Sequence, residues 1–298
     1  MARPSHWGKT PDMKPAGITS VDFNQAPFLV IWEMTRACAL ACVHCRADAI
    51  ARRDPRELTT NEGRRLIDQV RAISPRPLFV LTGGDPMRRP DLAELVRYAA
   101  DAGLTVALTP SGTAAATRER LAALKDAGLS RVAVSLDGPT PESHDAFRRV
   151  RGSYTWTMRI IDTTIDLGLP LQINSTVCRM TLPHLEAMAA RMDELPLTLW
   201  ALFFLIQTGR GTGLEQITAE ECERVLNHPA EFLDPEMRHN ADDAGHDEPV
   251  RDAARTRLTT WSAPAVTVSA DPGRGQTATP NRSRPCSSCP TRARNRSR

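Results

Sequence analysis

The sequence lacks the features of membrane-spanning, secreted and strongly basic proteins. It contains no run of about 18 apolar residues, so no membrane span is expected. Its first 24 residues are polar and hold no apolar signal-peptide core, so a cytoplasmic protein is expected. The formal net charge is only +3, which gives no general electrostatic reason to expect a nucleic-acid partner.

Cysteine is sparse outside one short segment. The chain has seven cysteines without a disulfide-like framework, which suits a reducing compartment. Cys38, Cys42 and Cys45 form a C-x3-C-x2-C motif directly after an apolar segment. Thiolates are the ligands that hold iron–sulfur clusters in proteins. Three of them leave one iron of a four-iron cube without a protein ligand, and that open iron is a place for chemistry.

Two other interpretations of these cysteines remain open at this point. Cysteine packs well in protein cores, so the spacing can be a coincidence. A zinc site normally pairs one C-x2-C with a second. The other such pair, Cys286 and Cys289, is far away in a segment of low apolar content. His44 stands between two of the cysteines, and its ring is expected to point away from a metal that they hold.

Short apolar runs alternate with amphipathic ones between residues 28 and 206. The apolar runs are rich in Val, Ile, Leu and Phe, which is typical of parallel strands buried on both faces. The predicted strands are 28–35, 78–82, 105–109, 131–136, 171–177 and 197–206, and the predicted helices are 60–73, 90–102, 117–127, 154–167 and 182–195. This α/β order fits an open doubly wound sheet or a complete or partial barrel, and both place ligands at the carboxyl ends of the strands.

Small and polar residues follow the predicted strands at that edge. The cysteine loop follows the first strand, Gly83-Gly84-Asp85-Pro86 the second and Pro110-Ser111-Gly112 the third. Ser135 and Asp137 flank the end of the fourth, Asn174 lies in the fifth, and Gly209-Arg210-Gly211 comes soon after the sixth. Each loop alone is an ordinary turn signal, but together they predict one site beside the cysteines.

The chain resembles the radical S-adenosylmethionine (radical SAM) enzymes from residue 28 to residue 211. The resemblance rests on the cysteine motif after the first strand and on a Gly-Gly-acid-Pro stretch after the second. The run from Ala26 to Cys38 is similar to the subgroup that carries a C-terminal SPASM or twitch domain. That subgroup includes enzymes of haem maturation and of peptide modification.

The resemblance implies a partial (β/α)6 TIM-like barrel that binds a [4Fe–4S] cluster and S-adenosylmethionine. It implies Cys38, Cys42 and Cys45 as ligands of three irons, with S-adenosylmethionine on the fourth. One electron, from a donor such as flavodoxin or ferredoxin, would cleave the sulfonium and give a 5′-deoxyadenosyl radical that takes a hydrogen atom from the substrate. His44 would shield the cluster.

The resemblance also implies which residues bind S-adenosylmethionine. Gly83 and Gly84 would let the backbone approach the ligand, with Asp85 in place of the glutamate usual in this family and Pro86 after it. A tight turn is the structural alternative for this stretch.

Four further residues are implied in cofactor binding. Ser135 and Asp137 would hydrogen-bond ribose hydroxyls, or else form a turn and a helix cap. Ser111 and Asn174 would face the cofactor. Arg148 and Arg149 either meet a carboxylate or lie on the surface, and we expect the surface.

The pattern ends beyond about residue 223. We expect a flexible extension over 1–25, the barrel over 26–211, a helical remnant over 212–239 and a disordered or frameshifted tail over 240–298. Residues 251–298 hold ten arginines and no lysine, and their apolar content is low. One encoding of residues 286–291, shifted by two bases, reads Leu-Phe-Val-Ser-His, which resembles a C-terminal strand of the subgroup. A basic tail that binds an acidic partner is the alternative.

The sequence therefore predicts a radical SAM enzyme acting on a tetrapyrrole-type small molecule or a peptide, impaired if its C-terminal part is shifted in frame. The alternative is an iron–sulfur or zinc-binding module without catalysis. A nucleic-acid partner for the arginine-rich tail would require binding that weakens steeply with salt. The substrate, the oligomeric state and any metal at Cys286 and Cys289 are not specified by the sequence.

Overall fold

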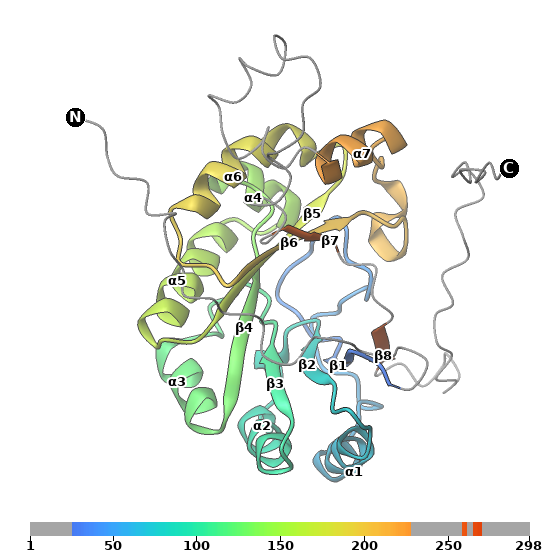
Figure 1. The fold of residues 1–298 in the computed structure, drawn as a ribbon, viewed down its shortest axis with the longest axis vertical. Coiled ribbons are helices and arrows are strands. Elements are labelled where there is room, and N and C mark those ends of the chain that lie inside the picture. Colours follow the sequence, from blue (N-terminus) through green and yellow to red (C-terminus); the bar gives the residue numbers. More distant parts are fainter. Residues whose placement is uncertain (1–25, 228–257, 261–264, 270–298) are drawn as a thin grey trace, which may run out of the picture.

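The computed structural model describes residues 26–227, 258–260 and 265–269 (Figure 1). The strands are β1 (Leu29–Thr35), β2 (Leu78–Gly83), β3 (Thr105–Leu108), β4 (Leu129–Ser135), β5 (Leu171–Val177), β6 (Leu199–Phe204), β7 (Leu258–Thr260) and β8 (Ala265–Ser269). The helices are α1 (Thr60–Arg71), α2 (Leu92–Asp101), α3 (Arg118–Asp126), α4 (Pro141–Arg148), α5 (Ser153–Asp166), α6 (Leu185–Asp193) and α7 (Ala219–Asn227), with 3-10 turns η1 (Pro86–Arg88), η2 (Leu182–His184) and η3 (Gly209–Gly213).

The strands form one parallel sheet whose order decides between the two predicted architectures. Strands β1 to β6 lie side by side in sequence order, each parallel to the next. A doubly wound sheet would reverse its order part-way across, and this sheet does not. The six-stranded partial barrel is therefore confirmed, and all six carboxyl ends meet at one edge.

Two short strands near the C-terminus extend this sheet at both edges. β7 pairs with β6, and β8 pairs with β1, both in parallel. Only residues 261–264 connect β7 to β8, and a chain of this length spans at most about 18 Å. The outer strands of the six are therefore brought close together, as in a sheet that curls toward closure. Both strands lie in the segment 240–298 that was expected to be disordered or frameshifted, and neither was predicted. The other residues of that segment lie outside the described part.

Helices cover the outer face of the curved sheet and bury a continuous core against it (Figure 1). α1 begins with a capping box in which Thr59 and Glu62 satisfy each other's backbone amides. α1 also approaches β1 closely, because a Cβ on Gly63 would lie 2.6 Å from the ring of Trp32. Trp32 is fully buried and stacks with Phe79 of β2.

Between residues 28 and 206 the predicted elements agree with the observed ones to within a few residues, with one additional α-helix. α4 was not expected, because its eight residues are too few to show a clear helical period. Thr140 caps its start and Pro141 occupies its first turn, which are the local signals that could have revealed it.

Among the described residues, no helix has the length and apolar character that crossing a membrane requires.

Candidate functional site

The three cysteines lie on a loop that leaves the carboxyl end of β1 and closes on itself. The amide of Cys38 donates to the carbonyl of Ile50 at 2.8 Å, and the amide of Ile50 donates to the carbonyl of Arg36 at 2.9 Å. Cys38 and Cys42 are buried, and Cys45 is half-buried. Burial raises the pKa of the Cys38 thiol, with the nearby Asp85 and Cys42 acting in the same direction.

Two distant segments hold the middle of this loop. The amide of Val43 donates to the carbonyl of Phe147 at 3.0 Å, at the end of α4. From η3, the Nε of Arg210 donates to the carbonyl of Cys42 at 3.0 Å, and its Nη1 donates to the carbonyl of Ala49 at 3.3 Å. The cysteine loop is thus fixed by main-chain contacts to α4 and by one arginine from beyond β6.

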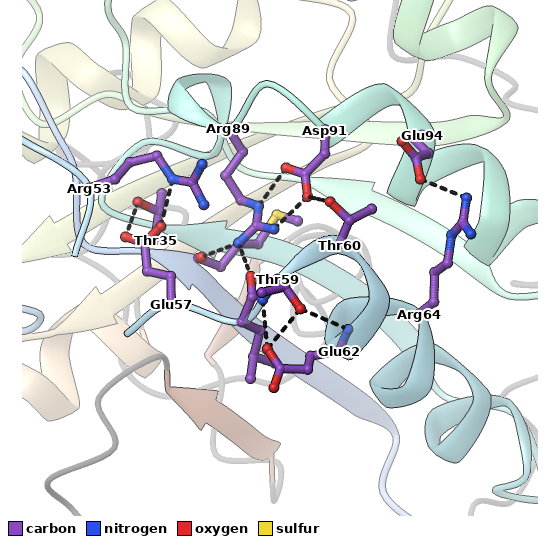
Figure 2. Close-up of polar contacts among 12 residues, drawn as sticks. Thr35, Arg53, Glu57, Thr59, Thr60, Glu62, Arg64, Arg89, Asp91 and Glu94 are labelled. Carbon is purple, nitrogen blue, oxygen red and sulfur yellow. Dashed lines mark hydrogen bonds and ion pairs between the residues drawn. The ribbon is translucent and has the colours of Figure 1, made fainter. Parts of the chain in front are cut away.

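A carboxylate fixes the start of the same loop. Glu57 is buried, and its Oε1 accepts from Thr35 Oγ1 at 2.6 Å and from the amide of Arg36 at 3.1 Å. Its Oε2 accepts from Arg53 Nε at 2.7 Å (Figure 2). Thr35 Oγ1 in turn accepts from the amide of Ala37 at 3.0 Å. These hydrogen bonds orient the residues that lead into Cys38.

A buried arginine joins the end of β1 to the start of two helices. The side chain of Arg89 is fully buried and donates to Met34 O at 3.1 Å and to Leu58 O at 3.0 Å. It also forms a two-point ion pair with Asp91, at 2.9 and 2.6 Å, which receives a further hydrogen bond from Thr60 (Figure 2). Burial opposes ionisation of Asp91, but Arg89 and Thr60 hold its pKa below the usual value.

The two glycines at the carboxyl end of β2, Gly83 and Gly84, lie directly against the cysteine loop. The amide of Gly84 donates to Thr35 O at 2.6 Å, and the amide of Asp85 donates to Ala37 O at 2.7 Å. Gly83 has a φ of +130°, a conformation that residues with a side chain rarely adopt, and a Cβ there would lie 2.4 Å from Thr35 O. Both positions therefore require glycine so that the two loops can meet.

A cavity of ≈ 230 Å³ opens between these loops. Seven of the predicted site residues line it, namely Cys38, Cys42, Cys45, Gly83, Gly84, Ser111 and Ser135. The hydroxyl of Ser111 donates to the carbonyl of Gly84. The structure thus brings together the cysteines and residues at or just beyond the carboxyl ends of β2, β3 and β4, as the parallel topology predicts.

Four predicted site residues do not line this cavity. Asp85 is fully buried: its Oδ1 accepts from the amide of Met87 at 3.1 Å, and its Oδ2 accepts from Thr113 Oγ1 at 2.7 Å. Its carboxylate therefore caps η1, which begins at the buried Pro86. Asn174 accepts a hydrogen bond from Gln172 at 2.7 Å on the same strand.

The fourth, Asp137, forms a buried ion pair instead. Arg148 donates to its Oδ2, and the amide of Thr176 donates to its Oδ1 at 2.7 Å. Burial opposes ionisation of Asp137, but the charge of Arg148 holds its pKa below the usual value. The surface position expected for Arg148 is therefore wrong: this residue is 8 % exposed, whereas Arg149 is exposed.

Four charged residues of the cavity wall were not assigned to it from the sequence, namely Glu33, Arg46, Arg148 and Arg210. Glu33 forms an ion pair with Arg46 across the cysteine loop. A carboxylate inside the otherwise apolar strand β1 was the signal that could have identified Glu33. No comparable signal marks Arg148, whereas Arg210 belongs to the glycine-containing loop after the sixth strand that the sequence placed at this edge.

His44 lies in the same wall and is held neutral. Its ring stacks on Phe147 with 4.4 Å between the ring centroids. Burial, reinforced by the charge of Arg148, lowers the pKa of His44 to about 4. A neutral, stacked ring beside the cysteines agrees with a shielding role.

The donor set of this cavity suits a cluster better than a single metal ion. Within the described residues, no three His, Cys, Asp or Glu side chains converge closely enough to hold one metal ion. Three thiols instead surround one cavity. Three polar atoms of its wall, His44 Nδ1, Arg148 Nε and Arg210 Nη2, are buried without a hydrogen-bond partner in the described part of the chain. A polar, negatively charged occupant held by several separated sulfurs would fit such a wall.

Comparison with known proteins identifies the family of this chain. The model of the Radical SAM superfamily matches residues 32–191, which include the three cysteines and strands β2 to β5. The chain belongs to the radical SAM superfamily. Members of this superfamily use a [4Fe–4S] cluster and S-adenosylmethionine, and the thiols and glycines of the cavity fit these two groups.

Curated relatives place this radical SAM chain in the SPASM-associated subgroup. An AdoMet-dependent heme synthase of Oleidesulfovibrio alaskensis is 41 % identical over 223 residues, covering 74 % of this chain and 57 % of the relative. An Fe-coproporphyrin III synthase of Methanosarcina barkeri is 30 % identical, and the match covers 74 % of this chain and 55 % of the relative. The chain therefore spans little more than half the length of these relatives.

Solved structures share the fold of the chain. Streptococcus suis SuiB bound to its precursor peptide SuiA gives a TM-score of 0.55 at 15 % identity, covering 70 % of this chain and 47 % of that one. The same protein bound to S-adenosylmethionine gives 0.56 at 13 % identity, covering 80 % and 51 %. At these identities the likeness concerns the fold alone.

Proposed function

We propose that this chain is a radical SAM enzyme that cleaves S-adenosylmethionine reductively and starts radical chemistry on a tetrapyrrole of haem formation. The observation that carries the reaction type is the cavity in which Cys38, Cys42 and Cys45 face Gly83 and Gly84. The similarity to an AdoMet-dependent heme synthase, at 41 % identity, supports the substrate class. A peptide is the alternative substrate and an outcome of the test below.

A bound cluster would supply the electron that breaks the sulfonium bond, and the protein's own contribution is to bind and orient the reactants and to exclude water. Cys38, Cys42 and Cys45 would hold three irons. Because Gly83 and Gly84 have no side chains, their backbone can approach S-adenosylmethionine closely, and Ser111 and Ser135 place hydroxyl groups in the same wall.

Asp85, Pro86, Asp137 and Asn174 were predicted to contact this cofactor directly. The hydrogen bonds above support a different role for Asp85 and Asp137, which hold η1 and Arg148 in place. Direct contact by these four residues stays a prediction. Substituting each and measuring the affinity for S-adenosylmethionine by equilibrium dialysis tests it.

An acidic electron-transfer protein such as flavodoxin or ferredoxin is the proposed reductant. Arg46, Arg52, Arg53 and Arg56 lie on the segment that directly follows the cysteine motif, and all four are exposed. Exposed arginines attract an acidic partner at a rate that falls with ionic strength. Free thiols in the described residues also suit a reducing cytoplasm.

Anaerobic reconstitution of the full chain with iron and sulfide tests the proposal. We expect about four irons per chain, lost in a variant with Cys38, Cys42 and Cys45 all changed to Ser, and a reduced-cluster EPR signal that shifts on adding S-adenosylmethionine. Colourless protein with one bound zinc would show the non-catalytic module instead.

Turnover separates the substrate classes. With dithionite, S-adenosylmethionine and iron coproporphyrin III, we expect 5′-deoxyadenosine formation and a change in mass of the porphyrin. Turnover only with a peptide would contradict the tetrapyrrole proposal. The shifted reading frame near residue 223 also stays a prediction, and sequencing the gene there tests it.

A further inference from the structure

Arg148 contacts a cysteine sulfur that the proposed function assigns to the cluster. Its Nη1 lies 3.6 Å from Cys42 Sγ, and its Nη2 donates to Asp137. Its own carbonyl accepts from the amide of Ala41 at 3.2 Å. One residue at the end of α4 therefore holds the cysteine loop by its backbone and a thiol by its side chain.

The surroundings of Arg148 fix both its charge and its direction. Asp137 is 2 % exposed and is itself held by the amide of Thr176. Burial opposes the charge of Arg148, but Asp137 and Cys42 raise its pKa above the usual value, so the guanidinium stays protonated. The Nε of Arg148 has no partner in the described residues, although the side chain lines the cavity.

We propose that Arg148 is a positioning residue that raises the reduction potential of a cluster held by Cys42, and that Asp137 limits this effect. The inference rests on the proposed function. Reduction of a bound cluster by one electron from dithionite adds one negative charge beside this sulfur. A buried cation and a hydrogen bond to a ligand sulfur stabilise that charge, whereas a buried carboxylate opposes it.

The two partners therefore predict shifts of opposite sign. Arg148→Met removes the cation and should lower the midpoint potential. Asp137→Asn keeps the shape but removes the opposing charge, and it should raise the potential. A merely structural role would not produce opposite shifts, because losing either partner would loosen the same contact.

An anaerobic redox titration of the reconstituted full chain, followed by the EPR signal of the reduced cluster, measures these shifts. We expect the order Asp137→Asn, wild type, Arg148→Met from highest to lowest potential. Arg148→Lys keeps the charge without the planar group and should lie between the wild type and Arg148→Met. Arg149→Met, at the exposed neighbouring residue, should match the wild type.

Each other outcome overturns the proposal. A cluster-loaded Arg148→Met with a potential at or above that of the wild type contradicts it. If neither Arg148 variant holds a cluster while Asp137→Asn leaves the potential unchanged, the role of Arg148 is assembly only. If the wild type itself assembles no cluster, the proposed function fails first, and iron analysis distinguishes that result from unchanged potentials.

Discussion

Gly84 meets the cysteine loop at Ala37 so closely that a Cβ on Gly84 would lie 2.6 Å from the carbonyl oxygen of Ala37. That same oxygen accepts the amide hydrogen bond of Asp85 at 2.7 Å. Neither loop can move away without breaking a buried hydrogen bond. The cavity wall is therefore set by the absence of a side chain as much as by the cysteines.

Gly84→Ala should separate these loops. The added methyl group meets backbone rather than a flexible side chain, so we expect a loss of about 1–3 kcal/mol in the free energy of unfolding and a clear fall in bound iron. Urea unfolding and iron analysis measure both. Gly213→Ala is the control, because a Cβ on Gly213 would have no neighbouring atom within 4 Å. Full iron loading of Gly84→Ala would show that the loops tolerate separation.

Glu57→Gln should weaken the start of the cysteine loop. The carboxylate accepts from Thr35, Arg36 and Arg53, and hydrogen bonds to a charged group contribute about 1.5–3 kcal/mol. We expect a loss of that order in unfolding free energy and a looser cluster, seen as faster iron release to a chelator. Glu94→Gln, which breaks an exposed pair with Arg64, should change neither; equal effects in both variants would refute the role of Glu57.

Arg89→Met should destabilise the fold strongly. It leaves the carbonyls of Met34 and Leu58 without this donor and Asp91 without its ion-pair partner. Breaking a buried pair in this way costs about 3–5 kcal/mol. Arg64→Met removes an exposed partner of α2 and should cost no more than about 1 kcal/mol. Chemical denaturation compares the two, and similar midpoints would contradict the prediction.

His144 should make the stability of the protein sensitive to acid. It is 1 % exposed, and its Nδ1 accepts from the amide of Asp137 at 3.2 Å. Burial, with the charge of Arg148, lowers its pKa from 6.5 to about 4, although Asp137 and Asp145 act in the opposite direction. The unfolded chain therefore binds the proton first as the pH falls. The contribution of this histidine to the free energy of unfolding should be fully present above about pH 6.5. It should be lost as the pH falls toward 4, by at most about 3 kcal/mol.

Unfolding measured from pH 7 to pH 4 checks this dependence. His144→Gln keeps an acceptor but cannot titrate there, so its unfolding free energy should fall less steeply with acid. Part of the slope should remain, because the pKa of His44 is also lowered to about 4. An unchanged slope in the variant would show that His144 does not contribute.

The sequence was sufficient for the parallel sheet and for the cavity's thiols, glycines and serines. The ends of the strands can be predicted because the apolar runs stop there, and a parallel sheet brings the carboxyl ends of its strands to one edge. Glu33 was readable in principle, as a charge within an apolar strand. The partner of each polar group could not be predicted from the sequence. Asp85 and Asp137 are carboxylates at the expected edge of the sheet, but Asp85 accepts a hydrogen bond from Thr113 and Asp137 forms an ion pair with Arg148.

Arg148 shows why the partners of buried polar groups could not be predicted from the sequence. It lies 106 residues from Cys42 in sequence, and two adjacent arginines give no sign of which one is buried. The helix that carries it was itself not predicted. The local signals at Thr140 and Pro141 place a helix start, but only packing against the loop determines which arginine turns inward.

The paired outer strands β7 and β8 have a consequence for any shortened version of this protein. Removing everything beyond Asn227 would leave the main-chain groups of β1 and β6 without the partners they now have in Ala265–Ser269 and Leu258–Thr260. The unpaired main-chain groups of an exposed edge strand can form hydrogen bonds with a strand of a second molecule. Such a fragment should self-associate with increasing concentration, and light scattering would reveal it.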